Sequence, residues 1–564
     1  MTKNRILVFV FALSFMLRLF GAWADSGSQI APKRWSFVTL GLTPVQSGGR
    51  IKPLDSFARE VVLFETGSRS FENWDSIDLL LSWISFPQDW GKKSLIQVAR
   101  EDVRRQLGLD EHRRWYSPQE LFKNSALLQY AEQHTGKGRA MPEVSGGSKV
   151  SPREQELKAV IERINLFHAL VTGHGWPLIP KPSPTAWASL ADGDREGEMI
   201  RNQFFQVLKS YEAQDESRFE RASLLFKSIV LGELPHNREI LKNQIWAELI
   251  YHKSRPFFWA WVFYLGAGLM WILCQILSRP RAIQKVKKLA FLLTGLALGS
   301  HILGIALRCF IAGRPPVTNM YESVMWVSLG VMIFAAILYW LHRQTVILTV
   351  ASILAMLGLI AGDAAPAILD PSLHPLVPVL RSNYWLTVHV LTITMGYAAF
   401  ALTLGLANIT LFQFLKGKKK EKIAGLNQLT YRAMQFGVIL IAAGTILGGI
   451  WADYSWGRFW GWDPKEVWAL VTLLCYLVIL HGRYANWVGS FGFAAWSAMS
   501  FLSVVMAWYG VNFILGAGLH SYGFATGGTP WVLGFVLLQV LYVLGVTWVH
   551  HRGRQWSRLF PYGS

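Results

Sequence analysis

A short stretch dense in tryptophan is the part of the sequence best suited to chemistry. Residues 451–468 contain five tryptophans together with carboxylates and Arg458. The aromatic belt at a membrane surface explains single tryptophans such as Trp259 or Trp531, but not such a cluster. Indole rings offer large, rigid apolar faces at low entropic cost. The cluster therefore predicts a site for a large flat apolar ligand, and a metalloporphyrin fits that description.

The end of this stretch reads Asp463-Pro464-Lys465-Glu466, which has a purely local interpretation as well. Asp463 suits a helix N-cap, Pro464 suits the first helical position, and Glu466 closes a capping box three residues after Asp463. A capping role and a role in a binding site are compatible, and both interpretations stay open for the two carboxylates.

A metalloporphyrin also needs axial ligands, which histidine can supply. His389 and His520 flank the tryptophan stretch in the sequence. His481 lies about 15 residues after Glu466, or ~22 Å further along a helix. His301 lies within another apolar run. An ionisable residue in an apolar span is a functional candidate, yet a lone histidine can simply link two helices by a hydrogen bond.

The composition excludes several classes of protein. The chain has 564 residues, of which 52% are hydrophobic and 16% charged, against about 25% charged in an ordinary soluble protein. Three cysteines and no Cys-x-x-Cys pair exclude a disulfide scaffold, a cysteine-rich metal site and a c-type cytochrome. Neither a P-loop, an HExxH motif nor a Ser/His/Asp arrangement occurs, which argues against a hydrolase or an ATPase.

The chain divides into three parts. Residues 1–24 have the pattern of a signal peptide, with an uncleaved N-terminal anchor as the alternative. Residues 25–255 are typical of a soluble extracytoplasmic domain. This domain is mainly helical, with helices expected at Leu54–Phe64, Pro118–Gln133, Arg153–Val171 and Glu198–Tyr211.

Residues 256–564 predict an all-α polytopic membrane domain of about nine transmembrane helices, and 452–468 is one of its loops. The spans are expected near 256–277, 288–310, 321–341, 345–362, 384–415, 430–451, 466–482, 490–511 and 531–549.

The net charge of +19 falls mainly in this apolar half, which favours charged membrane loops over nucleic-acid binding. One set of alternating loops carries fifteen lysines and arginines, whereas the other carries only Arg314, Arg381, Arg458 and Lys465. The positive-inside rule places the first set in the cytoplasm. With nine spans, residues 25–255 and the tryptophan loop then lie outside, which agrees with the signal pattern.

The tryptophan stretch resembles the WWD signature of haem-handling proteins. The matching residues are Trp456, Gly457, Trp460, Trp462, Asp463, Glu466 and Trp468. The order of His389, this loop, His481 and His520 resembles the CcsA/ResC cytochrome c biogenesis proteins of the system II pathway. Further matches are 313–323 (GRPPVTNMYES), 375–378 (PLVP), 518–523 (GLHSYG) and an N-terminal segment that contains 49–55 (GRIKPLD).

The resemblance implies a protein of the bacterial inner membrane that exports haem and serves as a subunit of a cytochrome c synthetase complex. It implies that His389 and His520 bind the iron outside the membrane and that His481 binds haem within it. The implied partners are a CcsB/ResB-like subunit, which supplies a further ligand unless His301 does, an apocytochrome c with a CxxCH motif, and a thiol reductant protein.

Arg458 or Arg381 would pair with the haem propionates. Two other functions stay open at this point. One is a non-catalytic factor that holds haem or cytochrome while a partner attaches it. The other is a small-molecule transporter gated by the tryptophan loop.

Overall fold

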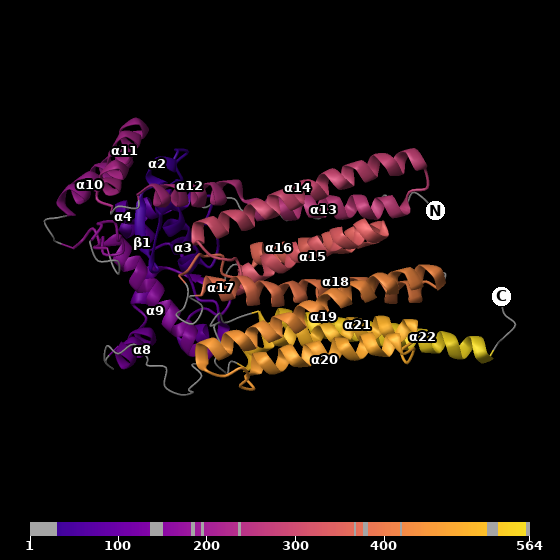
Figure 1. Cartoon of the computed structure of the whole chain (residues 1–564). Coiled ribbons are helices and arrows are strands. Elements are labelled where there is room, and N and C mark those ends of the chain that lie inside the picture. Colours follow the sequence, from indigo (N-terminus) through magenta and orange to yellow (C-terminus); the bar gives the residue numbers. More distant parts are fainter. Residues whose placement is uncertain are drawn as a thin grey trace.

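The computed structural model describes residues 31–135, 151–181, 187–192, 197–234, 238–365, 368–375, 382–417, 420–515 and 528–559. A helical N-terminal region covers one end of a long bundle of apolar helices (Figure 1). The segment 1–24 and His520 lie outside the described residues. The described part confirms the predicted fold class of a mostly helical chain with a helical N-terminal region.

The N-terminal region is built from short helices and two small antiparallel hairpins. Its first hairpin pairs Pro44 with Pro53 and turns at two glycines with positive φ, Gly48 and Gly49. The strands are β1 (Pro44–Ser47), β2 (Arg50–Pro53), β3 (Ile96–Gln97) and β4 (Trp115–Tyr116). The helices are α2 (Val38–Gly41), α3 (Leu54–Thr66), α4 (Ser76–Ser85), α5 (Pro87–Trp90), α6 (Glu101–Gln106), α7 (Pro118–Phe122), α8 (Ser125–Thr135), α9 (Pro152–Val171), α10 (Glu198–Glu212) and α11 (Glu216–Gly232).

This region has a hydrophobic core of its own, in which Trp83, Trp90 and Trp176 are almost completely buried. Three predicted helices are present as α3, α9 and α10. The predicted helix Pro118–Gln133 is instead two helices, because the side chain of Asn124 accepts a hydrogen bond from the backbone N–H of Leu127 and begins a new helix there.

Nine helices of the described chain are long and apolar enough to cross a membrane, which confirms the predicted number. The first candidate, Glu239–Ile276, joins most of α12 (Arg238–Ser254) to α13 (Pro256–Ile276). The others comprise α14 (Pro280–Ala312), α15 (Met320–His342), α16 (Thr345–Ala364), α17 to α18 (Asn383–Leu415), α19 (Lys420–Trp456), α20 (Pro464–Tyr484), α21 with its continuation η4 (Ser490–Leu515), and α22 (Thr529–Leu559).

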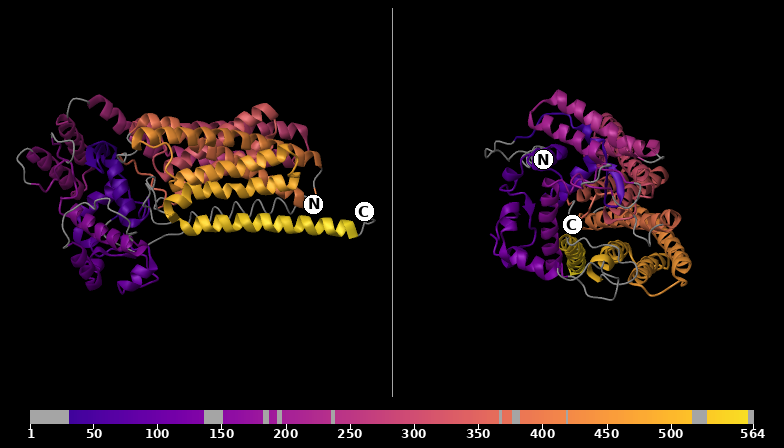
Figure 2. Two further views of the ribbon diagram at one scale, coloured as in Figure 1. Left: turned by 60° about the horizontal axis from the view of Figure 1, so that its bottom comes forward. Right: turned by 90° about the vertical axis from the view of Figure 1, so that its left-hand side faces the viewer.

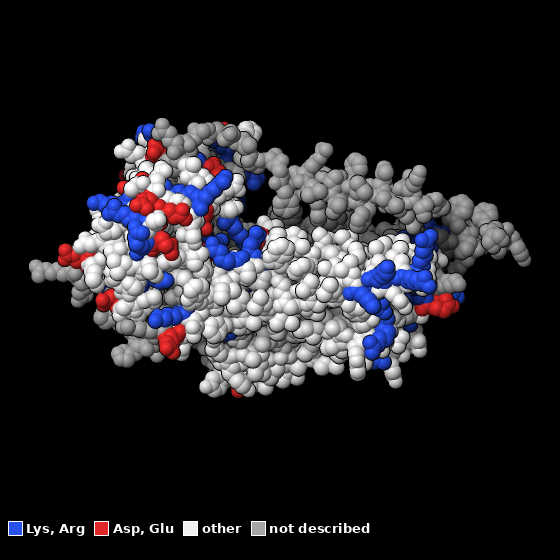
Figure 3. Space-filling model, turned by 90° about the horizontal axis from the view of Figure 1, so that it is seen from above, with Lys and Arg blue, Asp and Glu red and all other residues white. Residues whose placement is uncertain are grey.

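Successive connections lie at opposite ends of the bundle, so every second loop faces the N-terminal region (Figure 1). Helix α22 runs along the outside of the bundle and packs against α18 and α21 (Figure 2). On the face drawn in Figure 3, lysines and arginines gather at the end remote from the N-terminal region, and the surface between the two ends carries almost no charge. A membrane-spanning bundle requires such an uncharged belt.

Candidate functional site

A cavity of about 820 Å³ lies where the N-terminal region meets the bundle. Its size falls within the range of pockets that enclose small molecules and cofactors. Its walls come from α3 and α9 of the N-terminal region, from the loop 368–375, and from the ends of five membrane helices. Lining residues include Phe64, Arg163, Asn319, His374, His389, Trp451, Trp460, Lys465, Glu466, Trp508 and Phe513.

His389 lies in a π-helical segment, η3 (Leu386–Val390), that opens the fifth span. Its Nδ1 is 2.8 Å from the carbonyl oxygen of Gly444 on α19. A carbonyl can only accept, so Nδ1 carries the proton and Nε2 carries the lone pair. Such a second partner fixes the tautomer and the orientation of a metal-binding histidine. This hydrogen bond therefore holds His389 in the tautomer whose lone pair is on Nε2.

The imidazole of His389 is enclosed by α19. A Cβ atom built on Gly448 would lie 2.6 Å from Cε1 of His389, so only glycine leaves room for the ring at this position. On the neighbouring turn, the indole of Trp451 is 5.7 Å from the imidazole, measured between ring centroids. Trp385 stacks on Trp451 with an interplanar angle of 10°. Two indoles and one imidazole thus line up beside one wall of the cavity.

The tryptophan loop begins where α19 ends at Gly457, whose φ of +68° terminates the helix. Asp463 and Glu466 form the capping box that opens α20, as the local interpretation predicts. Oε2 of Glu466 accepts hydrogen bonds from the backbone N–H groups of Gly461 and Asp463. Its Oε1 is buried without a hydrogen-bond partner among the described residues. Because Glu466 lines the cavity, it both caps the helix and contributes a polar atom to the site.

Of the tryptophans predicted in the site, Trp460 lines the cavity. Trp462 lies 6.0 Å from it, nearly perpendicular, and is 72% exposed. The backbone of Trp462 has a φ of +57°, a strained value for a bulky residue. The loop therefore holds the exposed indole of Trp462 beside Trp460 at a conformational cost. Trp456 and Trp468 do not line the cavity.

Arg458 and Arg381 are the two cations that the sequence analysis predicts to pair with the haem propionates. The guanidinium of Arg458 lies 6.0 Å from the ring of Trp456 and against Gly461, and Arg458 does not line the cavity. Arg381 lies outside the described residues. The lysine and arginine that line the cavity in the described chain are Lys465 and Arg163. Nε of Arg163 donates a hydrogen bond to the carbonyl oxygen of Phe64, and Nη1 donates one to that of Gln97.

Two of the other histidines predicted as haem ligands, His481 and His301, do not line the cavity. His481 is exposed at the remote end of α20, and its Nδ1 lies 2.8 Å from the carbonyl oxygen of Leu477. His301 is fully buried between helices. Its two ring nitrogens lie 3.3 Å from the hydroxyl of Tyr264 and 3.0 Å from the carbonyl oxygen of Met325. His301 therefore links helices through both nitrogens.

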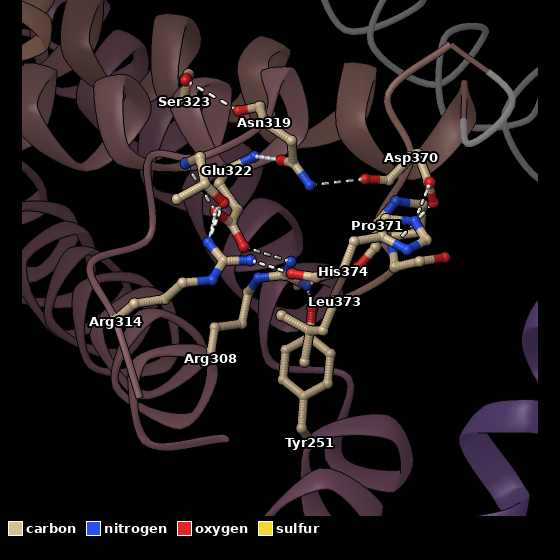
Figure 4. A network of polar contacts seen from close by, with 12 residues as sticks. Tyr251, Arg308, Arg314, Asn319, Glu322, Ser323, Asp370, Pro371, Leu373 and His374 are labelled. Carbon is tan, nitrogen blue, oxygen red and sulfur yellow. Dashed lines mark hydrogen bonds and ion pairs between the residues drawn. The ribbon is translucent and has the colours of Figure 1, made fainter. Parts of the chain in front are cut away.

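A buried ionic network next to the cavity is a feature that residue types alone did not indicate (Figure 4). The carboxylate of Glu322 pairs with Arg308 at 2.9 Å and with Arg314 at 3.1 Å. It also accepts hydrogen bonds from the backbone N–H and the hydroxyl of Thr318. All three charged side chains are less than 10% exposed. Arg314, Thr318 and Glu322 belong to the 313–323 segment, which the sequence singled out only by resemblance.

This network holds the loop 368–375 by its backbone. Arg308 donates to the carbonyl oxygen of Pro371 at 2.8 Å, and Arg314 donates to that of His374 at 2.9 Å. Arg50, from the GRIKPLD segment of the N-terminal region, donates to the carbonyl oxygen of Leu373 at 2.7 Å and pairs with Glu248. We call these three arginines the carbonyl clamp. The clamp fixes the loop and ties the N-terminal region to the bundle.

The clamped loop forms a polar edge of the cavity through Asp370, Ser372 and His374. Nε2 of His374 lies 2.9 Å from Oδ2 of Asp370. That hydrogen bond raises the pKa of His374 above its ordinary value, although burial opposes the shift. Burial also opposes the lowering of the Asp370 pKa, but hydrogen bonds from His374 and Ser372 outweigh it. The site thus pairs an apolar wall of aromatic rings with a polar edge.

Comparison with known proteins places this architecture in a family. Residues 317–520 match the family described as cytochrome C assembly protein. The CcsA proteins of Guillardia theta and Chlorella vulgaris are 31% and 34% identical to the chain. The matches cover 49% and 42% of this chain and 90% and 88% of those proteins. The chain belongs to the CcsA family of cytochrome c biogenesis proteins.

A longer relative extends the similarity beyond the membrane helices. Protein NrfI of Wolinella succinogenes is 29% identical over 489 residues, which covers 84% of this chain. Since 84% exceeds the share contributed by residues 256–564, the match includes part of the N-terminal region. The chain spans 53% of the length of NrfI.

Proposed function

We propose that this cytochrome c biogenesis protein exports haem across the membrane and presents it for covalent attachment to the CxxCH motif of an apocytochrome c. His389 and His520 bind the iron from opposite sides, and the tryptophan loop binds the macrocycle. The observation that supports the proposal is the position of His389: its hydrogen bond to Gly444 places the lone pair on Nε2, and the residue lines a cavity together with Trp451, Trp460 and Trp508.

The cavity suits haem, which is the substrate in this reaction. An apolar ring requires apolar faces, and its two propionates require cations or hydrogen-bond donors. Trp460 and Phe513 supply such faces, and Lys465 supplies a positive charge in the same cavity. Lys465 is therefore a better candidate than Arg458 to pair with a propionate.

The proposed route begins at the remote end of the bundle, where His481 binds incoming haem. Both nitrogens of His301 have partners inside the protein. This observation favours a CcsB/ResB-like partner as the source of the second ligand there. By the positive-inside rule, the basic end is cytoplasmic, so the N-terminal region, the cavity and the tryptophan loop face the periplasm. There the apocytochrome, kept reduced by a thiol reductant protein, meets the haem.

Haem absorption tests the proposal directly. The full chain, purified in detergent, is expected to show a Soret band that is weakened and shifted by His389→Ala and lost in the His389→Ala/His520→Ala double variant. His168→Ala, an exposed histidine on α9 away from the cavity, is the matched control. A wild-type spectrum in the folded double variant would refute iron binding by these residues.

Reconstitution distinguishes presentation from mere storage. Haem-loaded protein, a ResB-like subunit and a reduced CxxCH peptide are expected to yield a covalent haem peptide. Haem binding without any attachment in this mixture would show a holding factor instead.

A further inference from the structure

The polar edge of the cavity contains a carboxylate–histidine pair that the tryptophan loop and the iron ligands do not use. His374 and Asp370 are about half exposed and both line the cavity. Asp370 is itself held in place, because its Oδ1 accepts a hydrogen bond from the backbone N–H of Ser372 at 2.9 Å. The pair faces the space in which the substrate is expected to lie.

The hydrogen bond between Asp370 and His374 determines which nitrogen of the imidazole can accept a proton. An ionised carboxylate only accepts, so Nε2 of His374 carries the proton that is shared with Asp370. In the neutral imidazole, Nδ1 is then the basic nitrogen. Among the described residues, Nδ1 has no hydrogen-bond partner. A carboxylate that orients a histidine in this way is the usual arrangement of a general base.

The carbonyl clamp keeps this pair in a fixed position. Arg308, Arg50 and Arg314 hold the carbonyl oxygens of residues 371, 373 and 374, so the backbone on both sides of His374 is anchored. Proton transfer requires the base within hydrogen-bond distance of the proton it removes. A loop anchored at consecutive carbonyls supplies that precision, which a mobile surface loop lacks.

The attachment reaction needs a base. A free cysteine has a pKa of about 8.5, so only a few per cent is thiolate at pH 7. We propose that His374 is the proton-transfer residue of haem attachment and that Asp370 is its positioning residue. This inference rests on the proposed function. Nδ1 of His374 removes the thiol proton, the sulfur forms a bond to one vinyl carbon, and the other vinyl carbon gains a proton. The S–H bond and the vinyl π bond are consumed, an S–C and a C–H bond form, and no oxidant or reductant is needed.

The charges around His374 suit this role. Besides Asp370, Glu60 of α3 favours the protonated imidazole, whereas Lys52 of β2 opposes it. Lys52 is itself paired with Glu60. The guanidinium groups of Arg50 and Arg314 contact backbone carbonyls of the loop and are balanced by Glu248 and Glu322. With its raised pKa, His374 is a stronger base near neutral pH than an isolated imidazole.

The test uses the full chain with its ResB-like subunit, loaded with haem, and a peptide with one reduced CxxCH motif. At pH 7, His374→Gln is expected to slow thioether formation by about 100-fold. The Soret band stays unchanged because the iron ligands are intact. The defect shrinks towards pH 9, where the thiol ionises without help. Asp370→Asn retains the imidazole, slows the reaction less, and shifts the pH–rate profile. His112→Gln, at an exposed position away from the cavity, retains the wild-type rate.

Two results would overturn the inference. A wild-type rate and pH profile in folded His374→Gln would show that no proton passes through this residue. Loss of the Soret band in both His374→Gln and Asp370→Asn would show that the pair binds haem instead. Failure of the wild-type protein to attach haem at any pH would refute the proposed function itself.

Discussion

A methyl group added at Gly448 tests the geometry of the proposed iron site without removing any ligand. In the Gly448→Ala variant, the new Cβ would lie 2.6 Å from Cε1 and 3.1 Å from Nδ1 of His389. Non-bonded carbon atoms prefer separations of about 3.5–4.0 Å. The imidazole must therefore move by about 1 Å, which disrupts its 2.8 Å hydrogen bond to the carbonyl oxygen of Gly444.

The expected effect is large on function and small on folding. Crowding in a packed interior costs about 1–3 kcal/mol, but alanine is about 1 kcal/mol better than glycine inside a helix. The two terms nearly offset one another, so the variant stays folded. A misplacement of about 1 Å can reduce a rate about 100-fold. We expect a weakened or shifted Soret band and a loss of haem attachment of this order.

Absorption spectroscopy and thermal unfolding of the purified full chain measure the two effects separately. Gly425→Ala, on the same helix α19, is the matched control, because the nearest atoms to its new Cβ are 3.6 Å away or more. It should retain the haem spectrum with an unchanged or higher Tm. A Gly448→Ala variant with the wild-type spectrum and attachment rate would refute the assigned position of His389.

Three further predictions follow from charged residues. Glu322→Gln leaves Arg308 and Arg314 buried without their carboxylate, so we expect a loss of about 3–5 kcal/mol, measured by unfolding in detergent; a loss below about 1 kcal/mol would contradict the assigned network. Lys465→Gln removes a cation from the cavity, and a hydrogen bond to a charged group is worth about 1.5–3 kcal/mol. Haem affinity should fall roughly 10- to 100-fold while haem dimethyl ester binds as before, whereas equal losses for both would exclude a propionate contact. Burial raises the pKa of Asp78 to about 6, despite a hydrogen bond from Tyr211. The native state then binds more protons than the unfolded state between about pH 4 and 6, so this group makes stability fall as pH rises through that range. Asp78→Asn should remove this part of the pH dependence of Tm, and an unchanged profile would contradict it.

Much of the fold followed from local properties of the chain. Nine apolar runs predict nine membrane helices because each must satisfy its backbone hydrogen bonds internally. The capping box of Asp463 and Glu466 could likewise be predicted, since it depends on residues only three positions apart. The predicted helix at Pro118–Gln133 was wrong because a side-chain cap at Asn124 competes with helical periodicity.

The candidate site was only partly predictable. His389, Trp460 and Glu466 were expected in a site, and all three line the cavity. The predictions for His520 remain untested because it lies outside the described residues. His374 and Lys465 were not predicted in the site, because nothing in the sequence around them separates either residue from a solvated histidine or lysine.

The class of protein followed from the resemblance of short motifs to a known family, whereas composition and short-range spacing predicted the number of apolar helices and the tryptophan loop. Other features depend on tertiary packing. Arg50 contacts a loop more than three hundred residues later in the chain, and residues of α3 and α9 line the cavity at the end of the bundle. The physical reason is that contacts between distant segments depend on how whole surfaces pack. A buried carboxylate such as Glu322 is stable only where two guanidinium groups converge on it, and no local pattern encodes that convergence.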